Sequence, residues 1–588
     1  MYQFLVSAAH KSSGKTTISV GLCAALTRQG FTVQPFKKGP DYIDPMWLGQ
    51  ASGRDCFNLD PYLMTAEQIR QSFQGRAAAA AANVAIVEGN KGLYDGLALD
   101  GSNSNAGLAQ MLDLPVVLVL DARGMTRGVA PLILGYQAFD RRIRIAGVIL
   151  NQLGGARHES KLRAVIEHYT DVPVLGAIAH DPRLVMVERH LGLIPAPELD
   201  DAKERVRAMG ELIAAQVDVN AVLRAARRVQ TEPSAAARNT QTAKNNSHKS
   251  DEEPLRIGLA RDKSFGFYYP DDLEAFRRCG AEIIPFDTLQ DHTLPDVDGL
   301  FIGGGFPEMF TPELQANSAL RESIRKAIDA GLPVYAECGG LMYLARSIRR
   351  NGQSYAMVGA LPFDVAMHDR PVGRGYVTLE ATSEAPWPVC QTDGSRSLRG
   401  HEFHYSSLEN LAPDTRFAFR VVRGHGATGH HDGIVFRNVL ASYSHLRSDA
   451  GSNWVDGFVS FVRAHKSQVV PAPLHNGNTL KVNGKMVPTD NEGYLTNLDD
   501  WSEEFAEAQA KKENLELTES HWQVIAFLRA YFEEHRVQAQ VRAMIRHFAK
   551  AWGPERGNNH YLHELFPVGG PQKQGNRLAG LLKTKGEH

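Results

Sequence analysis

A single cysteine stands between a strand-like run and a helix-like run in PVYAECGGLMYLA, residues 333–345. Glycines follow Cys338 directly and would let other atoms approach its sulfur closely. A helix that starts here would also place its N-terminus near the sulfur and favour the thiolate. A buried core cysteine needs no such neighbours, and a disulfide cysteine needs a partner. The pattern therefore predicts that Cys338 is a nucleophile on a tight strand-to-helix turn.

A cysteine nucleophile needs a base within reach and donors that stabilise an oxyanion. The segment VLASYSHLRS ends a strand-like run at His445, which is our candidate base. The chain has 22 histidines, so spacing alone does not select it, and the competing residues are His401, His404 and His431. The run LFIGGGFPE ends a neighbouring strand with glycines whose backbone N–H groups could form an oxyanion hole. We assign this hole to Gly304, Gly305 and Gly339.

A second kind of chemistry is indicated near the N-terminus by FLVSAAHKSSGKTTISVGL, which reads as strand, loop and helix. The end of the loop resembles a Walker A motif, whose backbone N–H groups hold phosphates at a helix N-terminus. Lys15 would reach the β- and γ-phosphates of ATP, and the Thr16 hydroxyl would bind Mg²⁺. The first glycine of the strict motif is Ala9 here, so a lysine-bearing turn without a nucleotide is the alternative. We assign nucleotide binding to Gly14, Lys15, Thr16, Thr17 and Asn151, which ends the strand-like run GVILN.

Acidic residues follow two further strand-like runs, in FKKGPDYIDP and VEGNKGLYDG. Open α/β sheets bind ligands at the carboxyl ends of their strands, where these carboxylates would lie. Taken singly, each is more often a turn or helix-cap residue. Taken as a set, they predict a site for a hard cation. We assign Mg²⁺ to Thr16, Asp41 and Glu88. We assign the substrate region to Asp44 and Asp95.

The elements that must position these residues indicate an α/β fold. Apolar strand-like runs alternate with helical patterns in the first two blocks of the chain, which predicts parallel sheets covered on both faces. The third block is mainly helical after a short β-like start. Two polar or Pro/Gly-containing stretches separate the blocks. The predicted divisions are a first domain at 1–228, a linker at 229–254, a second domain at 255–465, a linker at 466–477 and a small third domain at 478–588.

Composition narrows the class of protein further. The 588 residues suggest several domains, and 43% apolar with 22% charged residues is ordinary for globular proteins. A formal net charge of −2 favours neither nucleic acid nor an anionic membrane as a partner. The sequence shows no signal-peptide layout and no run of about 18 apolar residues, so we expect a cytoplasmic protein. The five cysteines are scattered, which predicts reduced thiols rather than a zinc cluster.

The motifs together resemble the cobyrinic acid a,c-diamide synthase family over about residues 1–465. They are, in order, AHKSSGKTT, QPFKKGPDYIDP, NLDPYLM, VEGNKGLYDG, VLVLDARG, GLFIGGGFPE, YAECGGLMYL, GHEFHYS and ASYSHL. The resemblance implies a P-loop synthetase domain like dethiobiotin synthetase, joined to a class I glutamine amidotransferase domain. It makes Cys338 the glutaminase nucleophile and His445 its base. It also implies that ATP and Mg²⁺ activate the a and c acetates of a tetrapyrrole as acyl phosphates, which ammonia from L-glutamine then converts to amides.

One position departs from the wider class. Many class I amidotransferases have a glutamate two residues after the histidine, where this chain has Arg447. The subtype that this chain resembles works with a Cys–His dyad, so we expect a dyad here. The resemblance also suggests a homodimer. A related amidoligase of the cobyric acid synthase type is an alternative, but KGPDYIDP and VEGNKGLYDG favour the a,c-diamide synthase.

Residues 478–588 resemble a different family, the small sulfur-trafficking proteins DsrC and TusE. These work through cysteines on a C-terminal arm, and alignment of KQGNRLAGLLKTKGEH places Asn576 and Glu587 at the cysteine positions. Sulfur carriage needs a thiolate, so we expect this copy not to carry a persulfide. Dissimilatory sulfite reductases use sirohaem, a tetrapyrrole with acetate side chains. We therefore favour a sirohaem-type substrate over cobyrinate, with this domain docking the enzyme to sulfite reductase; the third hypothesis is a scaffold whose enzyme domains have decayed.

Overall fold

The protein is described here by a computed structural model. It describes the chain except residues 185, 187, 190–191, 200, 230–253, 390–394, 449–451, 469–478, 491, 496–497, 536–537 and 582–588. The chain divides into two compact units, Met1–Gln468 and Val469–His588. Most of the two predicted linkers, together with Cys390 and Glu587, lies outside the described residues. The domain boundaries therefore stay predictions.

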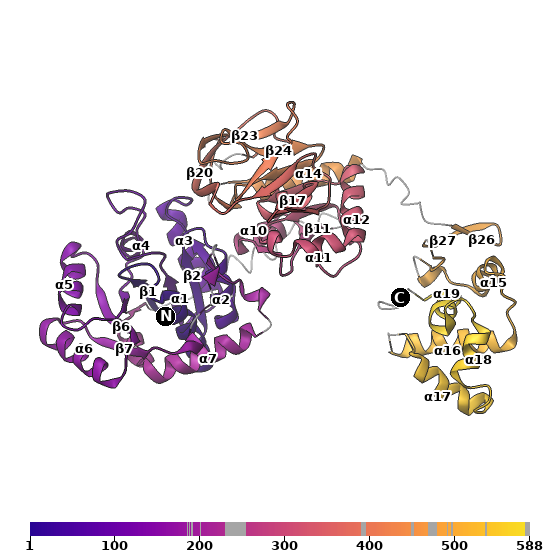
Figure 1. The fold of residues 1–588 in the computed structure, drawn as a ribbon, viewed down its shortest axis with the longest axis horizontal. Helices are drawn as coiled ribbons and strands as arrows, with labels where there is room; N and C mark the ends of the chain where they lie inside the picture. The colour runs from indigo at the N-terminus through magenta and orange to yellow at the C-terminus, as the bar shows by residue number, and fades with distance from the viewer. Residues whose placement is uncertain are drawn as a thin grey trace. The chain divides into compact units, whose positions relative to one another are not determined.

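The N-terminal part of the first unit is built on a parallel sheet, as the alternating pattern predicts (Figure 1). Its strand order is β3-β2-β4-β1-β5-β6-β7, and a short strand, β10, pairs antiparallel with β1. Parallel strands need crossover connections, which the helices supply. The strands are β1 Tyr2–Ala8, β2 Val33–Lys38, β3 Phe57–Leu59, β4 Val84–Glu88, β5 Val116–Asp121, β6 Ile145–Leu153, β7 Val174–Ala179 and β10 Arg227–Arg228.

Helices cover both faces of this sheet, so its strands are almost fully buried. One apolar core lies under α3 (Ala66–Ala79), α4 (Asn105–Leu112), α5 (Val129–Phe139) and α6 (Ala156–Tyr169). The other lies under α1 (Lys15–Arg28), α2 (Ile43–Ser52), α7 (Ala202–Gln216) and α8 (Val219–Ala225). The carboxyl ends of β1, β2 and β4 consequently meet at one edge, where the phosphate loop and the acidic segments begin.

A second sheet follows, with the order β13-β11-β14-β16-β25-β24-β23-β20-β21. Its first five strands are mutually parallel and the remaining neighbours are antiparallel. The strands are β11 Leu255–Ala260, β13 Ala281–Phe286, β14 Gly299–Ile302, β16 Val334–Glu337, β20 Gly373–Ala381, β21 Ser397–His404, β23 Arg416–Arg423, β24 His431–Phe436 and β25 Val439–Ser442. The helices α10 (Pro270–Arg278), α12 (Ser318–Asp329), α13 (Gly339–Leu344) and α14 (Trp454–Gln468) pack against it.

Polar contacts join the two sheets within the first unit. The Tyr376 hydroxyl donates to the buried carboxylate of Asp60 at 2.9 Å. Arg76, on α3, pairs with Asp271 of α10 at 3.0 Å, and the Nε of Arg447 donates to the other oxygen of Asp271 at 3.1 Å. Because these charged groups are buried or half-buried and paired, they fix the amidotransferase loops relative to the synthetase loops.

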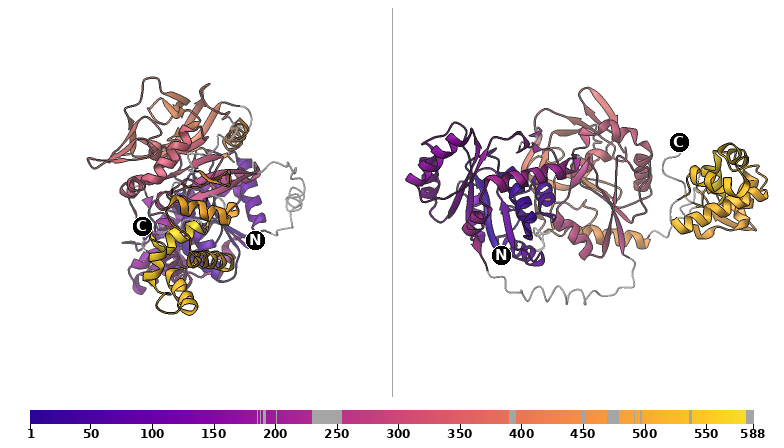
Figure 2. Two further views of the ribbon diagram at one scale, coloured as in Figure 1. Left: turned by 90° about the vertical axis from the view of Figure 1, so that its right-hand side faces the viewer. Right: turned by 90° about the horizontal axis from the view of Figure 1, so that it is seen from below.

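The second unit is a group of helices preceded by a β-hairpin, as predicted (Figure 2). Its elements are β26 Thr479–Val482, β27 Lys485–Pro488, α15 Glu503–Lys512, α16 Glu519–His535, α17 Val541–Trp552, α18 Asn559–Leu565 and α19 Asn576–Leu578. Asn576, at a cysteine position of the resembled family, is 1% exposed and donates to the carbonyl of Gln572. Next to it, Arg577 pairs with Glu513 at 2.6 Å, which holds the arm on α15. None of the helices in the described ranges of either unit is long and apolar enough to cross a membrane.

Candidate active site

The chain turns sharply at Cys338, between β16 and α13. The backbone there has φ 47° and ψ −100°, a combination that residues with a side chain rarely adopt. The N–H of Cys338 donates to the carbonyl of Ser442 at 2.7 Å and so anchors the turn on the neighbouring strand. Strained backbone held by its surroundings is typical of functional residues. The predicted nucleophile therefore stands on the predicted elbow.

Close packing explains the glycines around the thiol. A Cβ added to Gly305 would lie 1.9 Å from the backbone oxygen of Ser264. One added to Gly339 would lie 3.0 Å from the nitrogen of Gly305, and one added to Gly304 would lie 2.7 Å from the ring of His445. The three residues assigned to the oxyanion hole thus lie together beside the base. Their role as donors stays a prediction.

The predicted base lies in position. His445 is 3% exposed and lines the same cavity as Cys338. Burial lowers its pKa, but the hydrogen bonds to Cys338 and Glu337 outweigh burial and raise the pKa of His445 to about 10. The imidazole is therefore protonated at neutral pH and attracts a thiolate.

The competing histidines have other surroundings. The ring of His401 stacks on His445 at 4.8 Å, and burial lowers the pKa of His401 well below its usual range, so His401 stays neutral. The ring of His404 stacks on Tyr443, and that of His431 on Phe417. Of these rings, that of His445 contacts the carboxylate of Glu337, and its role as the base stays a prediction.

Glu337, the residue before the nucleophile, was missed by the sequence analysis. Its Oε2 lies 3.2 Å from Nδ1 of His445, and the residue is 2% exposed. Arg447, which replaces the usual glutamate, is directed instead to Asp271. A carboxylate inside the buried strand-like run PVYAEC was the available signal, because buried charges are rare unless they are paired.

The phosphate loop is built as predicted. Gly14 has φ 92°, and α1 begins at Lys15. A Cβ on Gly14 would lie 2.2 Å from Nδ2 of Asn151, which donates to the carbonyl of Ser13 at 2.9 Å. The structure therefore places Asn151 against the loop, and its reading of the base stays a prediction. The Thr17 hydroxyl donates to the carbonyl of Leu184 at 3.3 Å.

A buried lysine that the sequence analysis missed, Lys37, organises the predicted carboxylates. Its Nζ lies 2.5 Å from Asp44 and 2.9 Å from Glu88, with Asp41 at 4.0 Å. Burial lowers the pKa of Lys37, but Asp44 and Glu88 outweigh it and the net shift is upward, so the ammonium stays charged. The signal in the sequence was the pair of lysines that ends β2, next to a loop rich in carboxylates.

The Thr16 hydroxyl joins this cluster by donating to Glu88 at 2.7 Å and to Asp44 at 3.2 Å. Asp41 accepts the N–H groups of Ile43 and Asp44 through one oxygen and so starts α2. Its assignment to the metal stays a prediction. Asp95 accepts the N–H of Gly92 at 2.9 Å. Asp44, assigned to the substrate region, thus lies within hydrogen-bond distance of Thr16, and its role at the substrate stays a prediction.

The charge at Lys15 depends on the same cluster. Burial, followed by the charge of Lys37, lowers the pKa of Lys15 to about 8, while Glu88, Asp44 and Asp95 oppose that shift. A phosphate group would add negative charge next to this lysine and favour its protonated form.

The donor set fits a hard cation bound partly by phosphate. Glu88 is fully buried, and its Oε2 has no hydrogen-bond partner, while its other oxygen contacts Thr16. Across the described ranges, no group of three or more His, Cys, Asp or Glu side chains could hold a metal by itself. A hydroxyl and one or two carboxylates are what a site completed by phosphate oxygens and water requires.

One cavity connects the two sets of residues. Its volume is about 240 Å³, and its wall includes Asp41, Asp44, Cys338 and His445. Tyr42 lines it between the two carboxylates, with its ring stacked on Phe267. Most of the remaining wall is aromatic or apolar and comes from Phe306, Met342, Met367, Phe403 and Tyr405. A small neutral molecule released at Cys338 could reach the loop of Asp41 and Asp44 through this space, which Glu308 also lines.

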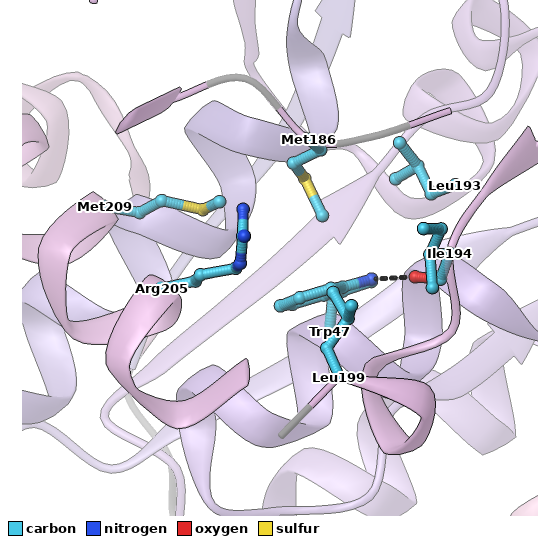
Figure 3. A pocket seen from close by; sticks show the side chains of 7 residues that line it. All are labelled: Trp47, Met186, Leu193, Ile194, Leu199, Arg205 and Met209. Atoms are coloured by element: carbon cyan, nitrogen blue, oxygen red, sulfur yellow. Dashed lines mark hydrogen bonds between the residues drawn. The ribbon is translucent and has the colours of Figure 1, made fainter. Parts of the chain in front are cut away.

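A second, smaller cavity lies outside the active site, behind the helix that carries Asp44. It lies between α2 and α7, has a volume of about 10 Å³ and is lined mainly by apolar side chains (Figure 3). Trp47 crosses it and donates from its indole to the carbonyl of Ile194 at 2.9 Å. The cavity has room for about one water molecule. The side chains around this cavity pack against α2 and so fix the position of Asp44.

Three family profiles match successive parts of the chain. They are an AAA domain at residues 2–187, a CobB/CobQ-like glutamine amidotransferase domain at 256–452 and a DsrC like protein at 481–586. A solved structure of DsrC from Allochromatium vinosum is 48% identical, with a TM-score of 0.18; it covers 19% of this chain and 97% of its own. A P-loop domain joined to a glutamine amidotransferase domain defines a glutamine-dependent amidoligase.

Relatives over the first unit identify the family. A protein named cobyrinate a,c-diamide synthase from Magnetococcus marinus is 44% identical over 465 residues, which cover 79% of this chain and 98% of that protein. A protein of the same name from Methanosarcina acetivorans is 42% identical over 472 residues, covering 76% of this chain and 92% of its own length. The chain therefore belongs to the cobyrinate a,c-diamide synthase family and carries an additional DsrC-like domain at its C-terminus.

The buried position of Lys37 leads to a prediction. A Lys37→Met variant removes the ammonium between Asp44 and Glu88, so the two carboxylates repel each other and the phosphate loop loses its support. We expect ATP-dependent amidation to fall by about 100-fold, as when one charged group of a preorganised site is removed, with glutaminase activity preserved. Lys91→Met, at an exposed position, is the control. Unchanged amidation in Lys37→Met would show that this lysine does not organise the site.

Proposed function

We propose that this chain amidates the a and c acetate side chains of a tetrapyrrole, using ATP and the amide nitrogen of L-glutamine. The observation that supports this most directly is the cavity that contains both Cys338 and the carboxylates next to the phosphate loop. Ammonia released in bulk water at neutral pH would become ammonium, which is not a nucleophile. A shared and largely apolar space keeps it neutral between its two reactions.

In the glutaminase half, the Cys338 thiolate attacks the amide carbon of glutamine. The backbone N–H groups of Gly305 and Gly339 would stabilise the oxyanion that forms. The C–N bond then breaks, and the His445 imidazolium gives its proton to the leaving nitrogen, so ammonia departs and a thioester remains. Neutral His445 next takes a proton from water, which hydrolyses the thioester to glutamate and restores the thiolate.

In the synthetase half, an acetate oxygen of the tetrapyrrole attacks the γ-phosphorus of ATP, and ADP leaves. Lys15 contacts the phosphates at the helix N-terminus and neutralises charge during transfer. Mg²⁺, held by Thr16 together with Glu88 or Asp44, would supply further neutralisation of the phosphates. Ammonia then attacks the acyl phosphate, phosphate departs, and a carboxamide results.

The relatives are named for cobyrinate, and the C-terminal domain supports a refinement. We infer that the substrate is a sirohaem-type tetrapyrrole, and that the DsrC-like unit docks the enzyme to dissimilatory sulfite reductase. With Asn576 buried at a cysteine position, that part of the arm has no thiol for sulfur transfer. Cobyrinate is the other candidate substrate. We also propose a cytoplasmic location and, from the family resemblance, a homodimer.

The alternative of a decayed scaffold is disfavoured by the preserved geometry. A scaffold would not need the strained turn at Cys338, the charged His445 beside it, or the hydroxyl of Thr16 on Glu88. Such features are costly to keep in a protein that only binds a partner.

Two substitutions test the division of labour. We expect Cys338→Ser to lose glutamine-dependent amidation and to keep amidation from added ammonium salt, because only the thiol is removed. Lys15→Ala should lose amidation from both nitrogen sources and keep basal glutamine hydrolysis. Mass spectrometry of sirohydrochlorin, sirohaem and cobyrinic acid after reaction would detect each replacement of a carboxyl OH by NH2. If the intact protein modifies none of these with Mg-ATP present, the enzyme assignment is wrong.

Removal of the second unit tests docking. A variant that ends at Gln468 retains the part of the chain that the relatives cover, and we expect it to keep amidation in solution while it no longer co-purifies with sulfite reductase. The full-length Cys338→Ser variant, which lacks activity but retains the domain, should still co-purify. Co-purification of the shortened protein would contradict the docking role.

A further inference from the structure

The amidotransferase site contains a third group that a Cys–His dyad does not need. Glu337 Oε2 lies 3.2 Å from Nδ1 of His445, and the contact is almost fully shielded from water. The other carboxylate oxygen accepts the backbone N–H of Leu446 at 3.0 Å and the hydroxyl of Tyr335 at 2.8 Å. The carboxylate is thus fixed by its own strand and by the residue that follows the histidine.

The strained turn explains how neighbouring residues can serve one imidazole. In a regular strand, successive side chains point to opposite faces, so residues 337 and 338 could not both reach the same ring. The left-handed φ of 47° at Cys338 breaks that alternation. As a result, His445 is hydrogen-bonded to Glu337 and shares a cavity wall with Cys338.

Many class I amidotransferases take this carboxylate from a glutamate two residues after the histidine, and this chain has Arg447 there, which makes other contacts. Arg447 is 1% exposed, and its guanidinium contacts Asp271 through Nε at 3.1 Å and the sulfur of Met64 at 3.4 Å. Met64 precedes α3 of the synthetase part, so Arg447 belongs to the junction between the two halves of the first unit. A glutamate at this position would lose the pairing with buried Asp271.

We propose that Glu337 is the positioning carboxylate of a Cys338–His445–Glu337 triad. It holds the ring with its Nδ1 toward the carboxylate and its other nitrogen toward the thiol, and it balances the positive charge of the imidazolium. In this arrangement the acidic member comes from the residue before the nucleophile. The proposal rests on the glutaminase half of the proposed function and does not depend on the identity of the tetrapyrrole.

Glu337 is the group that balances the positive charge of the His445 imidazolium, because the other side chains nearby do not supply a negative charge in its place. The titratable side chains around the pair are Tyr42, Tyr268, Asp272, Tyr335, Cys338 and His401. Burial raises the pKa of Tyr268, so its hydroxyl is neutral. Burial raises the pKa of Asp272 well above its usual range, which disfavours its charged form. Burial lowers the pKa of His401 well below its usual range, so His401 is neutral at pH 7. Burial likewise raises the pKa of Tyr42 and of Tyr335, which are neutral too.

The decisive experiment compares Glu337→Gln with wild type. Glutamine keeps the size of the side chain and an oxygen that can accept from Leu446, but it loses the charge. We expect the kcat for glutamine hydrolysis to fall by about 100-fold, the contribution of a well-placed acid–base group. The pH at which iodoacetamide alkylates Cys338 at half its maximal rate should move upward, because the imidazolium that attracts the thiolate is no longer stabilised. Glu313→Gln, on an exposed helix position, should match wild type in both.

Amidation from added ammonium salt reports whether the fold and the synthetase site survive in Glu337→Gln. If that activity is also lost, Glu337→Asp replaces it as the test: the shorter carboxylate keeps the charge, so the alkylation profile should stay near that of wild type while kcat falls by about 10-fold, because reach to Nδ1 is lost. An unchanged kcat together with a superimposable alkylation profile in Glu337→Gln, or in Glu337→Asp if it is needed, would overturn the triad. Failure of the wild type to hydrolyse glutamine at all would instead overturn the proposed function.

Discussion

An aromatic contact between the two reaction sites is the interaction on which the rest of the structure depends. The ring of Tyr42 lies 5.3 Å from that of His445 and is surrounded by Phe267, Tyr269 and His401. Tyr42 stands on the loop between Asp41 and Asp44, so the loop that carries synthetase carboxylates also forms part of the glutaminase wall. The two reaction sites therefore share one short segment, and a movement of this loop would change the geometry of both.

On each side of this segment, buried charged side chains lie next to groups of opposite charge. Lys37 lies among carboxylates at the synthetase site, and His445 lies between Glu337 and Cys338 at the glutaminase site. Buried ions are tolerated only when paired, and removal of one partner is costly. This explains why a single buried lysine or glutamate can matter as much as the residues that contact a substrate. It also explains why the contacts of Arg76 and Arg447 with Asp271 are kept at the junction.

The residues recognised from the sequence are those whose signal is local. The phosphate loop and the turn at Cys338 are each specified by a strand, a few glycines and a helix in one short stretch. Glu337 was missed because its partner, His445, lies 108 residues further along the chain. Lys37 has a partner nearby in the sequence, Asp44, but its second partner, Glu88, lies 51 residues away. The sequence assigned Asp41 to the metal and Asp44 to the substrate region, but it could not show which of them faces Thr16. Both follow β2, and the start of α2 decides it. The choice of His445 among its competitors came from the family resemblance, and the structure then supplied the geometric reason.

The central claim is that ammonia moves from Cys338 to the acyl phosphate inside the protein. The most direct measurement is the isotope content of the product when the enzyme receives L-glutamine labelled with ¹⁵N at the amide, together with unlabelled ammonium salt in excess. Internal transfer predicts that the new carboxamide contains mainly ¹⁵N, because ammonia released at Cys338 reaches the acyl phosphate before it mixes with the solvent. Product that instead carries the isotope ratio of the solution would show that ammonia escapes, and would contradict a shared cavity as the basis of the function.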